Sequence, residues 1–167
     1  LRSGAGRVTL GVPASLNDIF EVKLSEVMTV PLPEVRKRRC LSLRALGEAR
    51  ALLQRVDVLA LGPGLGRYRE TEELVRRLVL EGEVPLVLDA DGLNAFAGAA
   101  DLLRERLAPS VLTPHVVEFA RLSGLDKDQV AAAPIKVARD FATATKTTVV
   151  LKGAPTVVAL QDGRVAV

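Results

Sequence analysis

The stretch Val58-Leu59-Ala60-Leu61-Gly62-Pro63-Gly64-Leu65-Gly66 joins an apolar run of strand length to a turn rich in glycine. The same kind of ending recurs where later apolar runs stop, at 89–94, 113–115 and 152–154. A parallel strand that helices cover on both faces reads as a continuous apolar run. In open α/β sheets, ligands lie beyond the carboxyl ends of the strands. The pattern therefore predicts that four separate segments meet at one ligand site.

Helical patterns lie between the strand-like runs. Apolar residues at helical spacing predict helices at 16–24, 43–55 and 71–80, near 102–107, from Pro114 onward, and at 129–144. Ser15 is expected to cap the first of these helices, because serine is a favoured N-cap residue. Strand, glycine turn, helix and strand form a βαβ unit, which predicts an α/β fold.

The two ends of the chain differ in character. Residues 1–6 read as the tail of a helix, and the apolar run 8–12 follows them. Near the other end, the runs 147–152, 156–161 and 164–167 are typical of strands joined by tight turns. The pair Asp162-Gly163 is a strong hairpin signal, so we expect antiparallel strands there.

The composition limits the class of protein. The chain has 167 residues, 49% hydrophobic and 3% aromatic, which fits a single soluble domain. A net charge of +3 with so few aromatic residues argues against a nucleic-acid partner. One cysteine and one histidine cannot form an internal disulfide or a usual zinc site, so a cytoplasmic location is expected and no residue is assigned to a metal. No apolar stretch reaches the roughly 20 residues that cross a bilayer, so no membrane role is expected.

The glycine turn 62–66 has a functional and a structural interpretation. Glycine lets a backbone approach a ligand closely and point N–H groups at an anion. The third glycine of a dinucleotide-binding fingerprint would fall on Arg67, and no P-loop is present. The turn is therefore a candidate ligand contact, and it is equally consistent with a purely structural connection.

Polar residues follow the next strand-like run. Asp89 and Asp91 lie one strand period apart, so both carboxylates are expected to point the same way, toward magnesium or a substrate hydroxyl. The alternative for Asp91 is that it caps the helix beginning near Gly92. Asn94 either binds a ligand or caps a turn.

Two further candidates end the remaining runs. His115 is expected at a helix N-terminus that faces the same crevice, where it binds an anion or polar ligand or is structural. Lys152 is either a snorkelling surface residue or a phosphate contact. The basic run 36–39 is interpreted as a solvated loop, the alternative being a contact with a substrate phosphate.

The order of these motifs resembles one family, the ADP/ATP-dependent NAD(P)H-hydrate dehydratases of the ribokinase-like superfamily. The segments that carry the resemblance are 62–66, 89–94, 112–122 and 150–154, supported by 1–9 and 27–28. The resemblance implies a ribokinase-like three-layer sandwich, with helices on both faces of a mostly parallel sheet and a β-hairpin near the C-terminus. It also implies repair of nicotinamide cofactors, in which the S hydrate of NADH or NADPH loses water at the expense of ADP or ATP, with Mg²⁺.

Site residues follow from the resemblance motif by motif. It implies that the hydrated dinucleotide contacts Gly64, Gly66, Asp91, Asn94 and His115. It implies that the adenine nucleotide contacts Lys152, Gly153, Ala154, Pro155 and Thr156. A homo-oligomer, by resemblance a tetramer, is expected, together with a fused or separate NAD(P)H-hydrate epimerase.

The chain departs from the family pattern in two places. Val116-Val117 stands where the family has Pro-Gly between the histidine and the glutamate. The family's Gly-Thr-Gly-Asp segment, which supplies the catalytic aspartate, is expected beyond Val167, and a first strand and helix are expected before Leu1. We therefore expect one partial ribokinase-like domain over 1–167, inactive alone. A small-molecule kinase of the same superfamily and a non-catalytic nucleotide-binding module are the alternatives.

Overall fold

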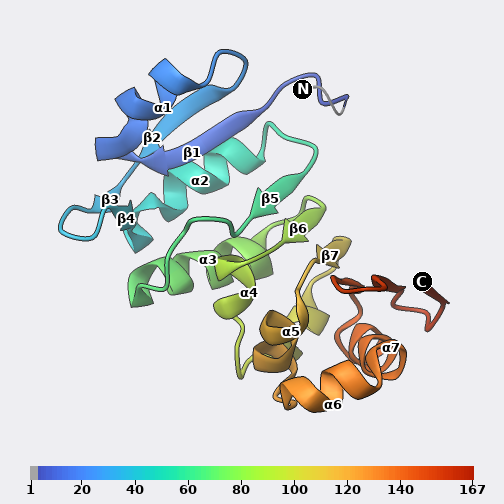
Figure 1. Ribbon diagram of the computed structural model, residues 1–167. Coiled ribbons are helices and arrows are strands. Elements are labelled where there is room, and N and C mark those ends of the chain that lie inside the picture. Colours follow the sequence, from blue (N-terminus) through green and yellow to red (C-terminus); the bar gives the residue numbers. More distant parts are fainter. Residues whose placement is uncertain (1–3) are drawn as a thin grey trace.

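A six-stranded sheet forms the centre of the molecule (Figure 1). The computed structural model describes residues 4–167. The strands lie in the order β10-β9-β8-β7-β6-β5, and β5 to β8 are parallel, whereas β9 and β10 run antiparallel to their neighbours. Their bounds are β5 Leu59–Leu61, β6 Leu86–Leu88, β7 Ser110–Leu112, β8 Thr148–Leu151, β9 Val157–Ala159 and β10 Val165–Ala166. The mostly parallel sheet and the hairpin at Asp162-Gly163 are as the sequence predicts.

The helices that follow β5 to β7 pack with the sheet. They are α3 (Arg69–Glu81), α4 (Asp91–Asn94), the 3₁₀ helix η3 (Ala100–Glu105), α5 (Val116–Ser123), α6 (Lys127–Ala132) and α7 (Pro134–Thr145). Figure 1 shows α5, α6 and α7 gathered at one end of the molecule.

The prediction of one helix over 129–144 is wrong. Pro134 is the first residue of α7, and the residue before it, Ala133, has a non-helical backbone that separates α6 from α7. A proline disfavours the helical conformation in the residue that precedes it. Two other helix boundaries differ from the predicted ones. The helix predicted near 102–107 is η3, which ends at Glu105. Pro114 does not open α5, because it precedes the N-cap residue of that helix.

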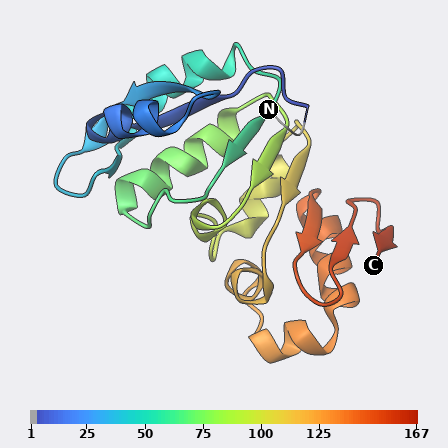
Figure 2. The same cartoon turned by 45° about the horizontal axis from the view of Figure 1, so that its top comes forward.

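A smaller layer comes from the first part of the chain. It contains the parallel pair β1 (Thr9–Pro13) and β2 (Met28–Leu32) and the antiparallel pair β3 (Glu34–Val35) and β4 (Cys40–Leu41). Its helices are η1 (Ala14–Leu16), α1 (Asn17–Lys23), η2 (Leu43–Ala45) and α2 (Leu46–Leu53). Figure 2 shows this layer beside α3, away from α6 and α7.

Two expectations for the start of the chain are not met. Ser15 does not cap a helix, because its backbone N–H and hydroxyl donate to the Glu34 carboxylate at 3.2 and 2.8 Å. Of the expected helical tail over 1–6, residues 1–3 lie outside the described residues, and residues 4–6 are not helical.

The central strands bury alternate residues. Leu86, Leu88, Leu112 and Leu151 belong to the main core cluster, together with side chains of α3 to α7. The residues between them on the strands, such as Val87, are only half-buried, so the strands are not buried on both faces within the described residues.

Helix α3 contributes to two hydrophobic clusters. Val75 and Val79 belong to the main core, and the adjacent stripe of Leu74 and Leu78 belongs to a second cluster with β2, β4 and α2. Leu61 and Leu65, on either side of the first glycines of the turn, pack against both clusters. No helix in the described part of the chain is long and apolar enough to cross a bilayer.

Candidate functional site

Four strand ends lie side by side at one edge of the sheet. The parallel register pairs Leu61 with Leu88, Leu88 with Leu112 and Leu112 with Val149. The glycine turn, the aspartate turn, the Thr-Pro-His segment and Lys152 therefore leave the sheet next to one another. This convergence is as the sequence predicts.

Two glycines allow the first two turns to touch. A Cβ atom on Gly62 would lie 1.7 Å from the carbonyl oxygen of Asp89, and one on Gly92 would lie 2.8 Å from that of Leu61. Gly64 and Gly66 are different, because both have φ of +74° and a Cβ atom on either would have no neighbouring atom within 4 Å. Gly62 and Gly92 are thus required for packing, whereas Gly64 and Gly66 border open space that a ligand can enter.

Asp91 ties the glycine turn to α4. Its Oδ2 accepts a hydrogen bond from the backbone N–H of Gly66 at 2.9 Å, and its Oδ1 accepts one from Asn94 Nδ2 at 3.3 Å. Ala90 is the N-cap of α4 and no side chain caps the helix, so the capping interpretation of Asp91 is wrong. Asp91 and Asn94 hold the turn in its conformation.

Asp89 turns toward another neighbour. Its Oδ1 lies 2.9 Å from Nζ of Lys152, and Ala90 between the two aspartates has a positive φ of 49°. The expectation that Asp89 and Asp91 point the same way is therefore wrong, because the backbone reverses between them. Sequence reasoning missed this pair, whose members are 63 residues apart.

The environment of Asp89 favours its charged form. Burial raises the pKa of this carboxyl, but hydrogen bonds from Lys152, Thr113 and the backbone, together with the charge of Lys152, outweigh burial and hold the pKa below its ordinary value. Because the folded-state pKa is the lower one, the interaction stabilises the fold above the ordinary pKa of aspartate. That contribution is lost as the pH falls through the folded-state pKa.

Lys152→Met is expected to raise the pKa of Asp89, because it removes the strongest stabilising contact and leaves the cost of burial. Carbon-13 NMR titration of the Asp89 carboxyl in the two proteins measures the change. Lys23→Met removes the same charge from an exposed site on α1 and serves as the control. An unchanged Asp89 titration in Lys152→Met would contradict the ion pair.

His115 is the N-cap of α5, as expected. Its Nδ1 accepts hydrogen bonds from the backbone N–H groups of Val117 and Glu118 at 3.1 and 3.2 Å, and Glu118 Oε2 accepts one from the His115 N–H at 2.9 Å. Helix α5 begins at Val116 even though Val116-Val117 replaces Pro-Gly. Because Nδ1 accepts, a neutral ring carries its hydrogen on Nε2, which lies 3.5 Å from Glu118 Oε1. The side chain is half-exposed, so a ligand can reach the ring beside that carboxylate.

Lys152 begins an exposed loop beside His115. Its backbone N–H donates to the carbonyl oxygen of Pro114 at 2.8 Å, and His115 and Lys152 form a parallel β-bridge. All five residues of 152–156 are exposed, and the Thr156 hydroxyl donates to the carbonyl oxygen of Gly153 at 3.2 Å. The loop is accessible, and it carries one cation at the sheet edge.

Metal-binding groups are sparse at this edge. Among residues 4–167, no three or more His, Cys, Asp or Glu side chains are placed to hold a metal ion together. Mg²⁺ is commonly bound through one or two carboxylates plus substrate phosphates, and the carboxylates of Asp89 and Asp91 are of that kind. The described donors fit an ion that arrives with a phosphate ligand better than a metal held by protein alone.

The sheet order and the strand-end site define an α/β protein of ribokinase-like type. Two solved structures share this fold. An ADP/ATP-dependent NAD(P)H-hydrate dehydratase from Bacillus subtilis, co-crystallised with ATP and Mg²⁺, matches with a TM-score of 0.73 and 26% identity, over 98% of this chain and 53% of its own. A ribokinase-like superfamily protein from Enterococcus faecalis matches with a TM-score of 0.74 and 22% identity, over 95% and 51%.

The sequence comparisons are more specific. The NAD(P)H-hydrate dehydratase family profile matches residues 1–167. A bifunctional NAD(P)H-hydrate repair enzyme of Moorella thermoacetica is 42% identical over 99% of this chain and 31% of its own length. An ADP-dependent (S)-NAD(P)H-hydrate dehydratase of Xanthomonas campestris is 35% identical over 98% of this chain and 54% of its own length. The chain belongs to the NAD(P)H-hydrate dehydratase family, and it spans about a third to a half of the length of these relatives.

Proposed function

We propose that the protein repairs nicotinamide cofactors by ADP- or ATP-dependent dehydration of the S hydrate of NADH or NADPH. The observation that carries the proposal is the family match over all 167 residues, whose most distinctive segments meet at one edge of the sheet. The similarity to a hydroxyethylthiazole kinase, at 16% identity and a TM-score of 0.54, reflects the fold alone. The dehydratase is therefore preferred to another small-molecule kinase.

The site is divided between two ligands in this proposal. Gly64, Gly66, Asp91, Asn94 and His115 contact the hydrated dinucleotide, and the loop 152–156 contacts the adenine nucleotide. Open space beside Gly64 and Gly66 and the half-exposed ring of His115 support the first assignment. The exposed cation at Lys152 supports the second, since lysine is a common phosphate ligand.

The proposed chemistry has two steps. The hydroxyl of the hydrate takes a phosphoryl group from the nucleotide, and loss of phosphate with a ring proton then restores the double bond. The described residues position the reactants, which supplies much of the catalysis in phosphoryl transfer. Mg²⁺ would neutralise charge on the phosphates, near the carboxylates of Asp89 and Asp91. The catalytic base is assigned to an aspartate of a Gly-Thr-Gly-Asp segment beyond Val167, which remains a prediction.

The partners are also part of the proposal. The relative from Moorella thermoacetica is bifunctional, which supports an accompanying NAD(P)H-hydrate epimerase, fused or separate. We assign the protein to the cytoplasm as a homo-oligomer, a tetramer by resemblance. Size-exclusion chromatography with light scattering would test the assembly.

The full gene product, incubated with S-NADH hydrate, Mg²⁺ and ADP or ATP, is expected to restore the absorbance of NADH and release phosphate. A stable phosphorylated product without NADH would identify a kinase instead. Nucleotide binding without turnover would identify a non-catalytic module.

Asp91→Ala is expected to lower kcat/KM for the hydrate about 10- to 100-fold, because the Gly66 N–H loses its acceptor and the glycine turn shifts. Steady-state kinetics of the full gene product measures this effect. Asp101→Ala, an exposed aspartate on η3, is the matched control and should change little. Equal kinetics for both variants would contradict the role of Asp91.

A further inference from the structure

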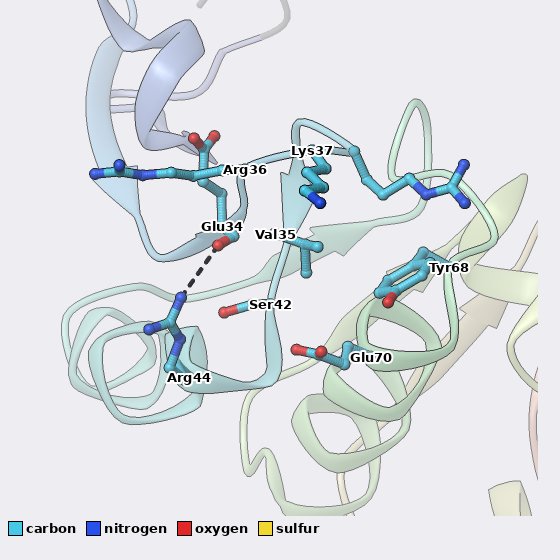
Figure 3. Close-up of a pocket in the computed structure, with 9 residues that line it drawn as sticks. Glu34, Val35, Arg36, Lys37, Ser42, Arg44, Tyr68 and Glu70 are labelled. Atoms are coloured by element: carbon cyan, nitrogen blue, oxygen red, sulfur yellow. Dashed lines mark hydrogen bonds between the residues drawn. The ribbon is translucent and has the colours of Figure 1, made fainter.

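A second polar site lies between the β3–β4 hairpin and the start of α3. The β3–β4 hairpin carries the basic run 36–39 and rests on the first turn of α3 (Figure 3). The buried Thr71 hydroxyl donates to the carbonyl oxygen of Leu41 at 2.7 Å, and the Arg38 guanidinium lies 5.8 Å from the ring centroid of Tyr68. These contacts join the hairpin to α3, and the basic run forms the exposed turn of that hairpin.

The hairpin and α3 form the walls of an open pocket of about 700 Å³. Figure 3 shows Ser42 and Arg44 on one side of it and Tyr68 and Glu70 on the other. Its charged lining residues are four cations and two carboxylates, at Arg36, Lys37, Arg38, Arg44, Glu34 and Glu70.

The cations of the pocket are available to a ligand. Among residues 4–167, none of these four forms an ion pair, although Arg44 donates to the backbone carbonyl oxygen of Glu34 at 3.3 Å. The Glu34 carboxylate already accepts two hydrogen bonds from Ser15. The pocket therefore has an excess of positive charge, which favours an anion.

A buried hydroxyl in the lining lacks a partner. Ser42 is 1% exposed, and its Oγ makes no hydrogen bond within the described residues. Buried polar atoms are nearly always hydrogen-bonded, and an exception calls for an explanation. A phosphate oxygen that displaces the side chains covering Ser42 would supply the missing partner, and the exposed Arg36 and Arg38 side chains would turn inward to bind the other oxygens.

The pocket adjoins the proposed dinucleotide site. Tyr68, which lines the pocket and is the N-cap of α3, is two residues after Gly66. Two residues span at most about 7 Å, which is short compared with an extended dinucleotide. A single ligand can therefore contact the glycine turn and reach into the pocket.

We infer that this pocket binds a phosphate group in the adenosine half of the hydrated dinucleotide, through Arg36, Arg38 and Ser42. The inference rests on the proposed function. It explains why a basic run is packed against the helix that follows the glycine turn. It also assigns the basic run to recognition of the dinucleotide substrate. The loop 152–156, which is proposed to bind the adenine nucleotide, is a separate site.

Calorimetric binding of unhydrated NADP⁺ and of ADP to the full gene product tests the inference without requiring turnover. Arg36→Ala/Arg38→Ala is expected to weaken NADP⁺ binding about tenfold or more and to leave ADP binding unchanged, because two charge-assisted contacts are lost. Ser42→Ala should weaken NADP⁺ binding to a smaller extent. Arg104→Ala, an exposed arginine on η3, controls for net charge.

The outcomes separate this inference from the proposed function. Weaker NADP⁺ binding in the double variant supports the pocket even if no dehydratase activity is found. Unchanged NADP⁺ binding overturns it, and so does an equal loss of ADP binding. A titration with inorganic pyrophosphate distinguishes one further case. If the double variant loses pyrophosphate binding but keeps NADP⁺ binding, the pocket binds a different phosphorylated ligand. The inference is then wrong. Arg36→Lys/Arg38→Lys should retain most of the affinity, which guards against misfolding of the alanine variant.

Discussion

Gly62→Ala is expected to destabilise the full gene product by more than about 4 kcal/mol, a large part of the stability of an ordinary domain. The new Cβ would lie 1.7 Å from the backbone carbonyl oxygen of Asp89, and Gly62 has φ of +143°, which is unfavourable for alanine. The clash involves backbone at the centre of the sheet edge, so no side chain can rotate to relieve it. Thermal unfolding should show a fall of roughly 10 °C or more.

Gly64→Ala is the matched control for this prediction. Gly64 also has a positive φ, of +74°, but no atom lies within 4 Å of the position of a Cβ. Only the conformational cost applies, about 1–2 kcal/mol. Similar melting temperatures for the two variants would contradict the close approach of the two turns.

Arg106→Met should destabilise the protein by about 3 kcal/mol or more. The buried guanidinium donates to the carbonyl oxygens of Val79, Gly82 and Val84, around the end of α3, and to Ser110 Oγ at 2.9 Å. Methionine fills similar space but leaves these carbonyl groups without a donor, each at a cost of about 1–3 kcal/mol. Urea unfolding of the two proteins measures the difference.

Arg104→Met provides the comparison, since Arg104 is exposed on η3 and its replacement should change stability by less than about 0.5 kcal/mol. If Arg106→Met were as stable as Arg104→Met, the guanidinium would not be the main partner of those carbonyl groups. Burial lowers the pKa of Arg106, which is consistent with a guanidinium held largely away from water.

The local features of the fold were predictable because they depend on neighbours in the chain. The stripe over 71–80 predicted α3, and the Asp-Gly pair predicted the final hairpin. The convergence of four strand ends followed from the rule that parallel strands share a direction. The break at Pro134 has a visible signal, the proline itself, but the apolar periodicity continues across it and predicts one helix.

The contacts that join distant segments were not predictable from one sequence. Ser15 looked like a helix cap, yet it binds Glu34 19 residues later. Asp89 and Lys152 are 63 residues apart, and no sequence pattern in either segment indicates that the two side chains form an ion pair. The basic run 36–39 is exposed, as its composition predicts, but the contact of Arg38 with Tyr68 on α3 carries no local signal. Tertiary packing therefore decided the details of the site.

The double role of α3 has a consequence for cooperativity. Its two adjacent stripes hold the two hydrophobic clusters together, so neither cluster can open without exposing the helix to water. The two clusters should therefore unfold as one unit, and the amide hydrogens of α3 should be among the slowest in the protein to exchange with solvent. Leu61 and Leu65 connect the glycine turn to the same unit. The backbone that borders the proposed substrate is thus anchored in the part of the molecule that opens last.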